Sequence, residues 1–568
     1  MAFKLVAGAT LEGSKVGLKP SLQASRISDS PARSGSMRKW IPWVAILAVA
    51  VAVMLSLPTT VDPIVNRTVA DVPLPPSPPC PPGSDCSDTH PCSAETMPSD
   101  EFETRWTAVG NNRMMSSPHA TDLNGDSVLD IVVGTGAEES HSGSIIAVDG
   151  ASGNLLWEAE TDGEMFASAQ FEDLNGDNVD DIALGGRDQQ MFAVNGATGE
   201  ILWSFDKAST LREAWYQFYS GQFIDDINDD NVADWLVANG GDPMKEPDDE
   251  RDNGYLMILS GADGLPLGVA DLPDGRETYM SPLLYTPHPD MAIEVLYGTG
   301  GETWDGSLWS TSIDAIMQGD LSTSTQIVAP TPNVKKGFMT PPAIADLTLD
   351  GIQDIVVSSF DGRLILVDGR NYTHTWTIDM HEVVENGTAS GLESWASPTV
   401  GYFTPDSVPD VFVNYVIGVF PQYSSSYYAL VDGATGDILW SETTEHTIFT
   451  SPLSVDLDSN GRDDIVLVRG AEEWREEGSL SYNSASVLDT CSMNTISLYN
   501  RTNLSIGTPL IADLDMDGDL EMVTTTTTGY LSETEGWTLT RMDLNASTPT
   551  RIGWGAYMGS QYDGLFLD

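Results

Sequence analysis

A nine-residue acidic pattern recurs along this chain and constrains the fold more than any other feature. Its fullest copies read Asp-x-Asn-x-Asp-x-x-x-Asp, as at residues 122–130. Eight copies keep one frame from about Trp106 to the end, and their starts lie 51 to 60 residues apart. A repeat of this length indicates one structural unit used many times, in place of several unrelated domains.

Each unit has the pattern of four short strands. An apolar stretch ending in a Ser-Pro-like pair precedes the acidic loop, and an apolar run such as residues 130–133 follows it. Two more strands flank turns such as DGASG, NGATG and DGATG, where Asp-Gly and Asn-Gly favour hairpins. We therefore expect an all-β fold, a β-propeller of seven or eight four-stranded blades, with eight favoured by the eight copies. Residues 551–564 are expected to complete the ring near Trp106.

The acidic loops are expected to bind Ca²⁺. Oxygen side chains fall at loop positions 1, 3, 5 and 9, and hard oxygen ligands at odd positions of a tight turn suit this ion. The alternative is an acidic turn that uses Asp, Asn and Gly for backbone reasons alone. The predicted ligands are Asp122, Asn124, Asp126, Asp130; Asp173, Asn175, Asp177, Asp181; Asp226, Asn228, Asp230, Asp234; Asp346, Asp350, Asp354; Asp456, Asp458, Asn460, Asp464; and Asp513, Asp515, Asp517, Glu521.

Two copies have lost most of these ligands. The fourth keeps only Asp290 and Glu294, and the sixth only Asp406 and Asp410, so we expect no ion in either. In the fifth copy Thr348 is a weaker third ligand. The expected role of calcium is structural, because a fully liganded ion leaves no open position for a substrate.

The segments before the repeats predict a membrane anchor and a stalk. Residues 40–57 form an apolar run of 18 residues without a charge, close to the minimum for a transmembrane helix. Residues 1–39 contain seven basic and two acidic residues, which predicts a disordered cytoplasmic tail and an exterior propeller at residues 101–568. Residues 58–100 are rich in Pro and Ser, as expected of an extended stalk. A retained signal anchor is favoured over a cleaved signal peptide.

Charge and cysteines narrow the classes of partner. The net charge of −58 makes nucleic acid an unlikely partner, because phosphate contacts need clustered Lys and Arg. Cys80, Cys86 and Cys92 allow one local bridge plus a bond to Cys491 or to a second chain, giving a disulfide-linked dimer through the stalk. A zinc site with His90 is disfavoured, since C-x5-C-x5-C is not a usual zinc spacing.

The repeats resemble two known families over roughly residues 105–568. The DLNGDxxxDIVVG copies resemble the FG-GAP or VCBS repeat of integrin α-chain propellers and their microbial relatives. The AVDGATGxxLW copies resemble the tryptophan-docking repeat of propellers related to quinoprotein (PQQ-like) dehydrogenases. A type II anchor followed by such repeats is similar to membrane proteins of the FG-GAP group. These resemblances imply a propeller of seven or eight blades.

The predicted function is binding of a protein or glycan partner, as in a cell-surface adhesion or receptor-like protein. If the strands run A to D outward, the acidic loops join A to B and the DGATG turns join C to D on one face, whereas the long connections lie on the other. Aromatic residues in these long connections are candidate contacts, against the alternative that they only seal the blades. They are Trp215, Tyr216, Tyr219, Trp304, Trp309, Tyr423, Tyr427 and Trp474.

Two alternatives are a quinoprotein-dehydrogenase-type enzyme and a scaffold for envelope protein assembly. An enzyme is disfavoured, because a bound quinone with three carboxylates needs basic residues and the propeller has few. The seven His are scattered, with no HExxH zinc motif and no G-x-S-x-G nucleophile motif.

Overall fold

The computed structural model describes one propeller unit. The described residues are 92, 102–136, 142–209, 217–241, 245, 249–384, 391–419, 422–475, 478–527, 536–549 and 551–566. The predicted tail, the anchor at 40–57 and most of the stalk lie outside them. Within the described residues, no helix is long and apolar enough to cross a membrane.

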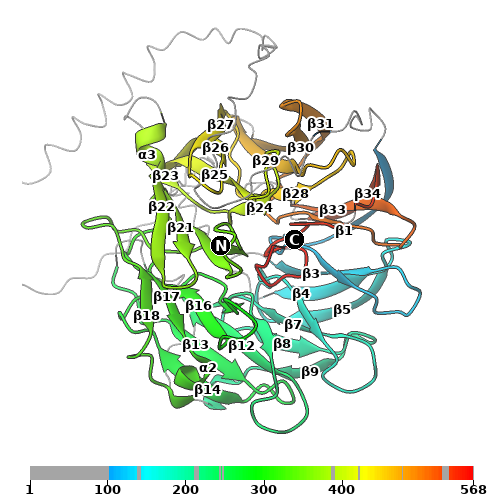
Figure 1. Cartoon of the computed structure of the whole chain (residues 1–568). Helices are drawn as coiled ribbons and strands as arrows, with labels where there is room; N and C mark the ends of the chain where they lie inside the picture. Colours follow the sequence, from blue (N-terminus) through cyan, green and yellow to red (C-terminus); the bar gives the residue numbers. More distant parts are fainter. Residues whose placement is uncertain are drawn as a thin grey trace, which may run out of the picture. The chain divides into compact units, whose positions relative to one another are not determined.

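The propeller has eight blades, each an antiparallel sheet, and this confirms the predicted fold class (Figure 1). Blades 1 to 3 consist of β2 (His119–Thr121), β3 (Asp130–Gly136), β4 (Gly143–Val148), β5 (Leu155–Thr161); β6 (Gln170–Glu172), β7 (Asp181–Gly185), β8 (Met191–Val194), β9 (Ile201–Ser204); and β10 (Gln217–Phe218), β11 (Gln222–Ile224), β12 (Asp234–Gly240), β13 (Tyr255–Leu259), β14 (Pro266–Asp271).

Blades 4 to 6 continue the same order around the axis. They consist of β15 (Leu283–Tyr285), β16 (Glu294–Gly298), β17 (Leu308–Thr311), β18 (Thr325–Val328); β19 (Ala343–Ala345), β20 (Asp354–Ser358), β21 (Arg363–Asp368), β22 (Thr373–Asp379); and β23 (Leu392–Glu393), β24 (Thr399–Gly401), β25 (Asp410–Val419), β26 (Gln422–Val431), β27 (Ile438–Thr444). Short helices η1 (Lys207–Ser209), α2 (Ile313–Gln318) and α3 (Met380–Val383) lie in the connections.

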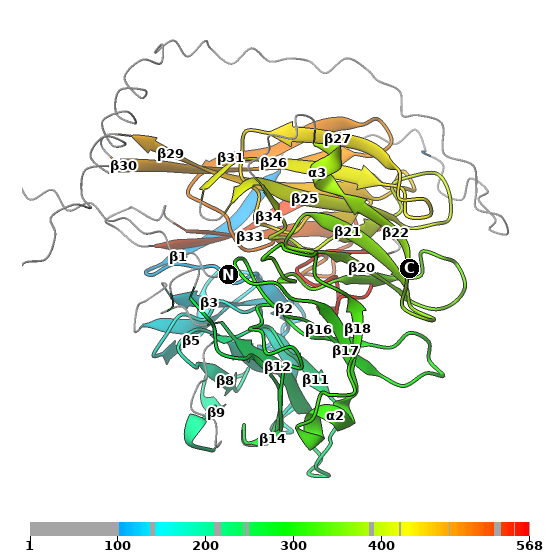
Figure 2. The same cartoon turned by 90° about the vertical axis from the view of Figure 1, so that its left-hand side faces the viewer.

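The last blade closes the ring with a strand from the other end of the described chain. Blade 7 contains β28 (Leu453–Val455), β29 (Asp464–Arg475), β30 (Gly478–Asp489) and β31 (Asn494–Thr502). Blade 8 contains β32 (Leu510–Ala512), β33 (Asp519–Thr527) and β34 (Trp537–Ser547), and its outer strand is β1 (Glu103–Gly110), antiparallel to β34 (Figure 2). Pairing of β1 with β34 therefore joins the first and last blades.

Residues 551–566 do not complete a blade, contrary to the expectation from the sequence. They run into the centre of the ring, where Figure 1 shows the red C-terminal segment. Trp554 forms a backbone bridge with Ser454 of blade 7, and Gly564 accepts a hydrogen bond from the Ile344 N–H of blade 5 at 2.8 Å. The segment is rich in apolar and small residues, so it can fill the space that the inner strands leave at the axis. It cannot form the outer strand of blade 8, because β1 already occupies that position.

Tryptophan docking holds neighbouring blades together. Trp157 Nε1 of blade 1 donates to the Gly196 carbonyl oxygen in the C-to-D turn of blade 2 at 2.7 Å, and Trp203 makes the same bond to Gly261 of blade 3. Gly199, with φ +75°, lies against the Trp157 ring, where a Cβ would meet Trp157 Cγ at 2.7 Å. Gly199, the second glycine of this NGATG turn, is therefore required by close packing as well as by its left-handed backbone.

Candidate metal loops and axial residues

The acidic loops are shaped by hydrogen bonds from their own backbone. In the first loop Asp122 accepts from the N–H of Gly125 at 2.7 Å and of Ser127 at 3.0 Å, and Asp126 accepts from Val128 at 2.9 Å. Such side-chain to backbone bonds are typical of Asx turns. Part of the recurring pattern is thus explained by backbone geometry.

The acid at position 9 ties two connections together, a role that the sequence analysis missed. Asp130 begins β3 and is fully buried, and its carboxylate accepts from Leu123 N–H in the acidic loop and from Gly150 N–H in the C-to-D turn, both at 2.9 Å. The same pair of bonds recurs at Asp181 and Asp354. Burial raises the pKa of the Asp130 carboxyl to about 6. The acidic and DG motifs that recur in the same order in several blades were the available signal, although 15 to 27 residues separate the acid from the glycine.

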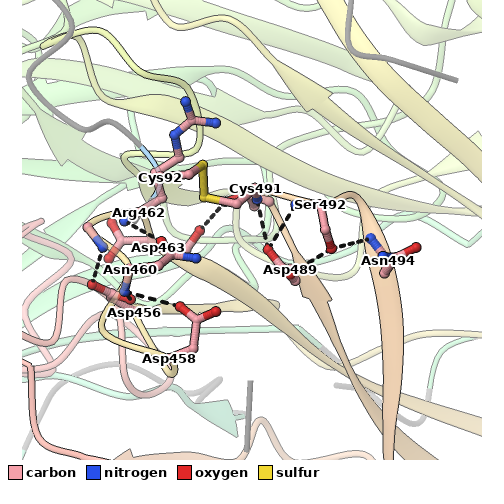
Figure 3. Close-up of a disulfide and its surroundings, with 12 residues drawn as sticks. Cys92, Asp456, Asp458, Asn460, Arg462, Asp463, Asp489, Cys491, Ser492 and Asn494 are labelled. Carbon is pink, nitrogen blue, oxygen red and sulfur yellow. Dashed lines mark hydrogen bonds between the residues drawn. A yellow bond between two sulfur atoms is a disulfide. The ribbon is translucent and has the colours of Figure 1, made fainter. Parts of the chain in front are cut away.

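The seventh loop departs from this arrangement because the C-to-D turn of its blade lacks glycine. That turn reads DTCSMN, and Cys491 in it forms a disulfide with Cys92 (Figure 3). Asp464 keeps its bond from Leu457 N–H at 3.0 Å, but its Oδ1 is buried without a hydrogen-bond partner. Asp458 Oδ2 is also buried without a partner. Two carboxylate oxygens are therefore buried and unsatisfied in one loop, a costly arrangement without a cation.

Three acids of the seventh loop meet closely enough to share one ion. One oxygen from each of Asp456, Asp458 and Asp464 lies within 4.8 Å of the other two. Burial raises the pKa of Asp458 to about 6 and that of Asp464 well above its ordinary value, and the charge of Asp489 raises both further. A bound cation would reverse these shifts, so this acidic cluster could hold a metal ion.

The eighth loop has the same carboxylates but a guanidinium among them. Asp513, Asp515 and Glu521 meet the same 4.8 Å condition. Arg541 of β34, 3% exposed, donates to Asp515, and its Nη2 lies 3.4 Å from Glu521 Oε1. Here a side chain supplies positive charge that a metal would otherwise supply. The basic residue 20 positions beyond the loop gave no recognisable signal in the sequence.

In the remaining loops the acidic side chains do not come as close together. Among the described residues, no three acids of the loops that begin at Asp122, Asp173, Asp226 and Asp346 meet within 4.8 Å, and calcium there stays a prediction. In the fourth copy Glu294 accepts hydrogen bonds from Ser310 and, at 2.5 Å, from Tyr372. In the sixth copy the buried Asp410 accepts from Thr404 N–H at 2.8 Å and Gly433 N–H at 3.2 Å.

The predicted partner-binding aromatics have different surroundings. Tyr219 and Tyr427 are buried, at 4% and 5% exposure. Trp304, Trp309 and Tyr423 are partly exposed, and Trp304 lies between Lys335 and Arg276, whose cationic groups are 4.6 and 5.3 Å from its ring. Trp474 lies in β29, but its side chain, like Trp215 and Tyr216, lies outside the described part of the chain.

Hydroxyl side chains form a collar around the axis, just before the inner strands. Ser451 N–H donates to Thr508 Oγ1 and Thr508 N–H donates to Ser117 Oγ, both at 2.9 Å, so blade 7 is bonded to blade 8 and blade 8 to blade 1. Ser168 N–H donates to Ser220 Oγ in the same way. The Ser or Thr of the recurring Ser-Pro-like pair therefore forms contacts between blades. The sequence showed that this pair recurs but did not indicate these contacts.

Comparison with known proteins identifies a family and a fold. The family model of the FAM234A/B β-propeller matches residues 139–460, more than half of the chain. No curated protein matches the sequence. The solved structures similar to this chain include the quinohemoprotein alcohol dehydrogenase ADHIIG of Pseudomonas putida HK5, at 12% identity over 79% of this chain and 77% of that one, with a TM-score of 0.52. The quinohemoprotein alcohol dehydrogenase of Comamonas testosteroni is 13% identical over 80% and 78%, with a TM-score of 0.50.

Proposed function

The chain belongs to the FAM234A/B β-propeller family, and from this premise we propose that it is a membrane-anchored, extracytoplasmic binding protein. It holds a protein or glycan partner on the face opposite the acidic loops. Residues 40–57 are its anchor, and ions in the acidic loops stabilise the ring.

The place where the chain enters the propeller, at Cys92 and β1, is the main support for this proposal. The strand β1 is antiparallel to β34 and so begins at the face of the acidic loops and C-to-D turns. Cys92, ten residues upstream of residue 102, is bonded to Cys491 in the C-to-D turn of blade 7 on that same face. The chain thus enters the propeller on the acidic-loop face, and for this reason we assign the partner to the opposite face.

The opposite face combines partly exposed aromatic residues with a rigid support. Trp304 Nε1 donates to the Asp249 carbonyl oxygen at 2.9 Å, and Arg276 beside it pairs with Asp305 at 2.6 Å. Tyr423 donates to Glu393, which also accepts from Lys336 at 2.5 Å. Aromatic residues held in fixed positions lose little entropy on binding, as expected of an interface.

The test is a partner screen with matched variants on the two faces. The full chain in lipid nanodiscs is screened against glycans and against proteins of its own envelope, and Trp304→Ala is compared with Met516→Ala, a 68% exposed residue of the acidic-loop face. We expect Trp304→Ala to reduce binding of the partner tenfold or more, roughly 1.4 kcal/mol, and Met516→Ala to leave it unchanged. If Met516→Ala lost binding and Trp304→Ala did not, the partner would bind the acidic-loop face and the proposal would be wrong.

Calcium is the proposed ion, and the seventh loop is its best site. Two buried, unsatisfied carboxylate oxygens support this, since Ca²⁺ prefers oxygen ligands. We expect calcium at 100 times its Kd to stabilise the fold by about 2.7 kcal/mol over chelator. Asp458→Asn should remove most of the contribution of this loop, and Asp290→Asn in the fourth copy should change nothing. Equal melting temperatures of the wild type in calcium and in chelator would contradict the proposal.

A further inference from the structure

A cavity of about 110 Å³ lies on the propeller axis between the collar and the face opposite the acidic loops. Its wall is built from the residues that precede the inner strand of each blade, among them Phe166, Tyr279 and Trp395. Tyr557 of the C-terminal segment also lines it, and its hydroxyl lies 3.4 Å from Ser281 Oγ. The C-terminal segment therefore occupies the acidic-loop end of the axis, and the aromatic layer is at the other end.

The lining selects against anions. It contains aromatic rings, the thioethers of Met115 and Met339, and hydroxyl groups, but none of its residues is Lys, Arg or His. Adjacent rings meet edge to face, with centroids 5.4 Å apart for Phe166 and Tyr219 and 6.1 Å for Tyr219 and Tyr279. Aromatic faces and oxygen lone pairs are electron-rich, so the wall favours a neutral or cationic guest over an anionic one.

Buried charges of blades 2 to 6 lie near the aromatic layer, and one carboxylate among them has no ion-pair contact within the described part of the chain, although the charges of Arg251 and Lys336 act on it. Three acids are paired with bases: Glu164 with Arg187, Glu277 with Arg251 at 3.3 Å, and Glu393 with Lys336 at 2.5 Å. Glu302, 5% exposed, has no base within ion-pair distance among the described residues, and its Oε2 is buried without a hydrogen-bond partner. Burial raises the pKa of Glu302. A buried carboxylate in this condition is stabilised by protonation or by an added cation.

Glu302 is next to the cavity wall. The backbone of its neighbour Gly301 packs on Tyr279, since a Cβ at residue 301 would lie 2.4 Å from Tyr279 Cε2. Lys336 donates to the Glu302 carbonyl oxygen at 2.5 Å, and its Nζ lies 5.0 Å from the centre of the Phe360 ring, which meets Trp395 edge to face at 4.9 Å. Burial and then the charge of Glu302 raise the pKa of Tyr279, which lines the cavity, so the Glu302 carboxylate is close to the wall without being part of it.

We propose that this cavity binds a small organic ammonium ion, whose apolar body contacts the aromatic layer and whose charge is compensated by Glu302. Cation–π contacts with the wall and the charge of a buried carboxylate close behind it both favour such a guest. The volume sets its size, because an apolar cavity of about 150 Å³ accommodates benzene, so a ligand of about five heavy atoms fits here. This site is independent of a macromolecular partner on the surface, and either can fail without the other.

The test uses three molecules that share a tert-butyl group. The ammonium ion and the alcohol have the same shape and size and differ in charge, and the larger carboxylate serves to detect a preference for anions. The full chain in nanodiscs is titrated with tert-butylammonium, tert-butanol and pivalate at neutral pH, and binding is followed by calorimetry and by saturation-transfer NMR of the tert-butyl protons. We expect the cation to bind at least about tenfold more tightly than the alcohol, and pivalate not to bind. An equal affinity for all three, a preference for pivalate, or no binding of the cation would overturn the proposal.

A variant pair assigns the charge preference to one residue. Glu302→Gln should weaken the cation about tenfold or more and leave tert-butanol unchanged, while Glu160→Gln on the exposed side of β5 should leave both unchanged. The melting temperature of each variant shows whether it is folded. An unaltered cation affinity in folded Glu302→Gln would remove Glu302 from the site. If Glu302→Gln does not fold, the order of the three ligands on the wild type still decides the proposal.

Discussion

His119 shows how a single buried residue makes the stability of this propeller depend on pH. Its ring stacks on Tyr562 with centroids 3.6 Å apart, and Nδ1 donates to the Ala169 carbonyl oxygen at 2.6 Å. Burial lowers the pKa of His119 to about 4, below its usual value near 6.5. The unfolded chain therefore takes up a proton as the pH falls below 6.5, whereas the folded chain stays neutral until about pH 4.

Stabilisation by neutral His119 should be present above pH 6.5 and lost as the pH falls toward 4. Between pH 7 and pH 5 this costs the folded state about 2 kcal/mol. Carboxyl groups with raised pKa values, such as Asp130, have the opposite effect on stability, because they favour the folded state as the pH falls. Their effect is the same in the wild type and in a His119 variant, so it cancels in the comparison. Between pH 7 and pH 5 the free energy of unfolding of the wild type should therefore fall by about 2 kcal/mol more than that of His119→Gln. Urea titration at the two pH values measures the difference. Parallel pH curves for the wild type and His119→Gln would contradict the assignment.

Arg541 should make the eighth loop independent of calcium. Removing its guanidinium leaves Asp515 and Glu521 without their base, which typically costs about 3–5 kcal/mol for a buried pair. We expect Arg541→Gln to melt well below the wild type in chelator and to regain most of the difference in calcium. The melting temperature in both media is the measurement. A variant that is equally unstable in both would show that the loop cannot exchange the guanidinium for an ion.

At the scale of the element, each docked tryptophan should contribute strongly to the contact between blades. Trp157→Phe loses the bond to Gly196, worth about 1 kcal/mol, whereas Trp157→Ala also loses the packing of a buried ring and should cost about 3–5 kcal/mol. Trp440 of blade 6 has no bond to a turn among the described residues, so Trp440→Ala should cost less. Urea unfolding gives the three values. An order in which Trp440→Ala costs most would contradict docking as the main contact.

The elements that repeat were predictable from the sequence, and the exceptions were not. Strand order, the position of the acidic loops and the docking turns follow from motifs that recur in the same order, such as Asp130 and then Gly150. Arg541 stands in for a cation in one loop only, and a single departure has no pattern that periodicity can detect. A bond from a stalk cysteine to Cys491 was one predicted alternative, and the structure forms it with Cys92. The cavity is formed by residues from blades far apart in the chain, such as Phe166 and Trp395, so only the closed ring shows it.

At the scale of the whole molecule, the C-terminal segment should act as an axial brace. Trp554 is fully buried, Arg551 pairs with Asp463 at 2.8 Å, and Phe566 N–H donates to the Ile344 carbonyl oxygen at 2.9 Å. Deleting residues 551–568 leaves β1 and β34 intact but should lower the free energy of unfolding by at least the 3–5 kcal/mol expected for loss of one buried Trp. The urea midpoint measures it, and an unchanged midpoint would show that the brace contributes nothing.

The pairing of β1 with β34 also sets a schedule for biosynthesis. The cysteines that clamp the ring are 399 residues apart, a stretch that a ribosome makes in roughly 20 to 80 s at ordinary rates. During that time β1 has no partner, and its alternating Glu103 and Arg105 place charges along the waiting edge, a common protection against intermolecular pairing. The ring can close only when blade 8 has been made, so an interrupted chain remains an open arc with two unpaired edges.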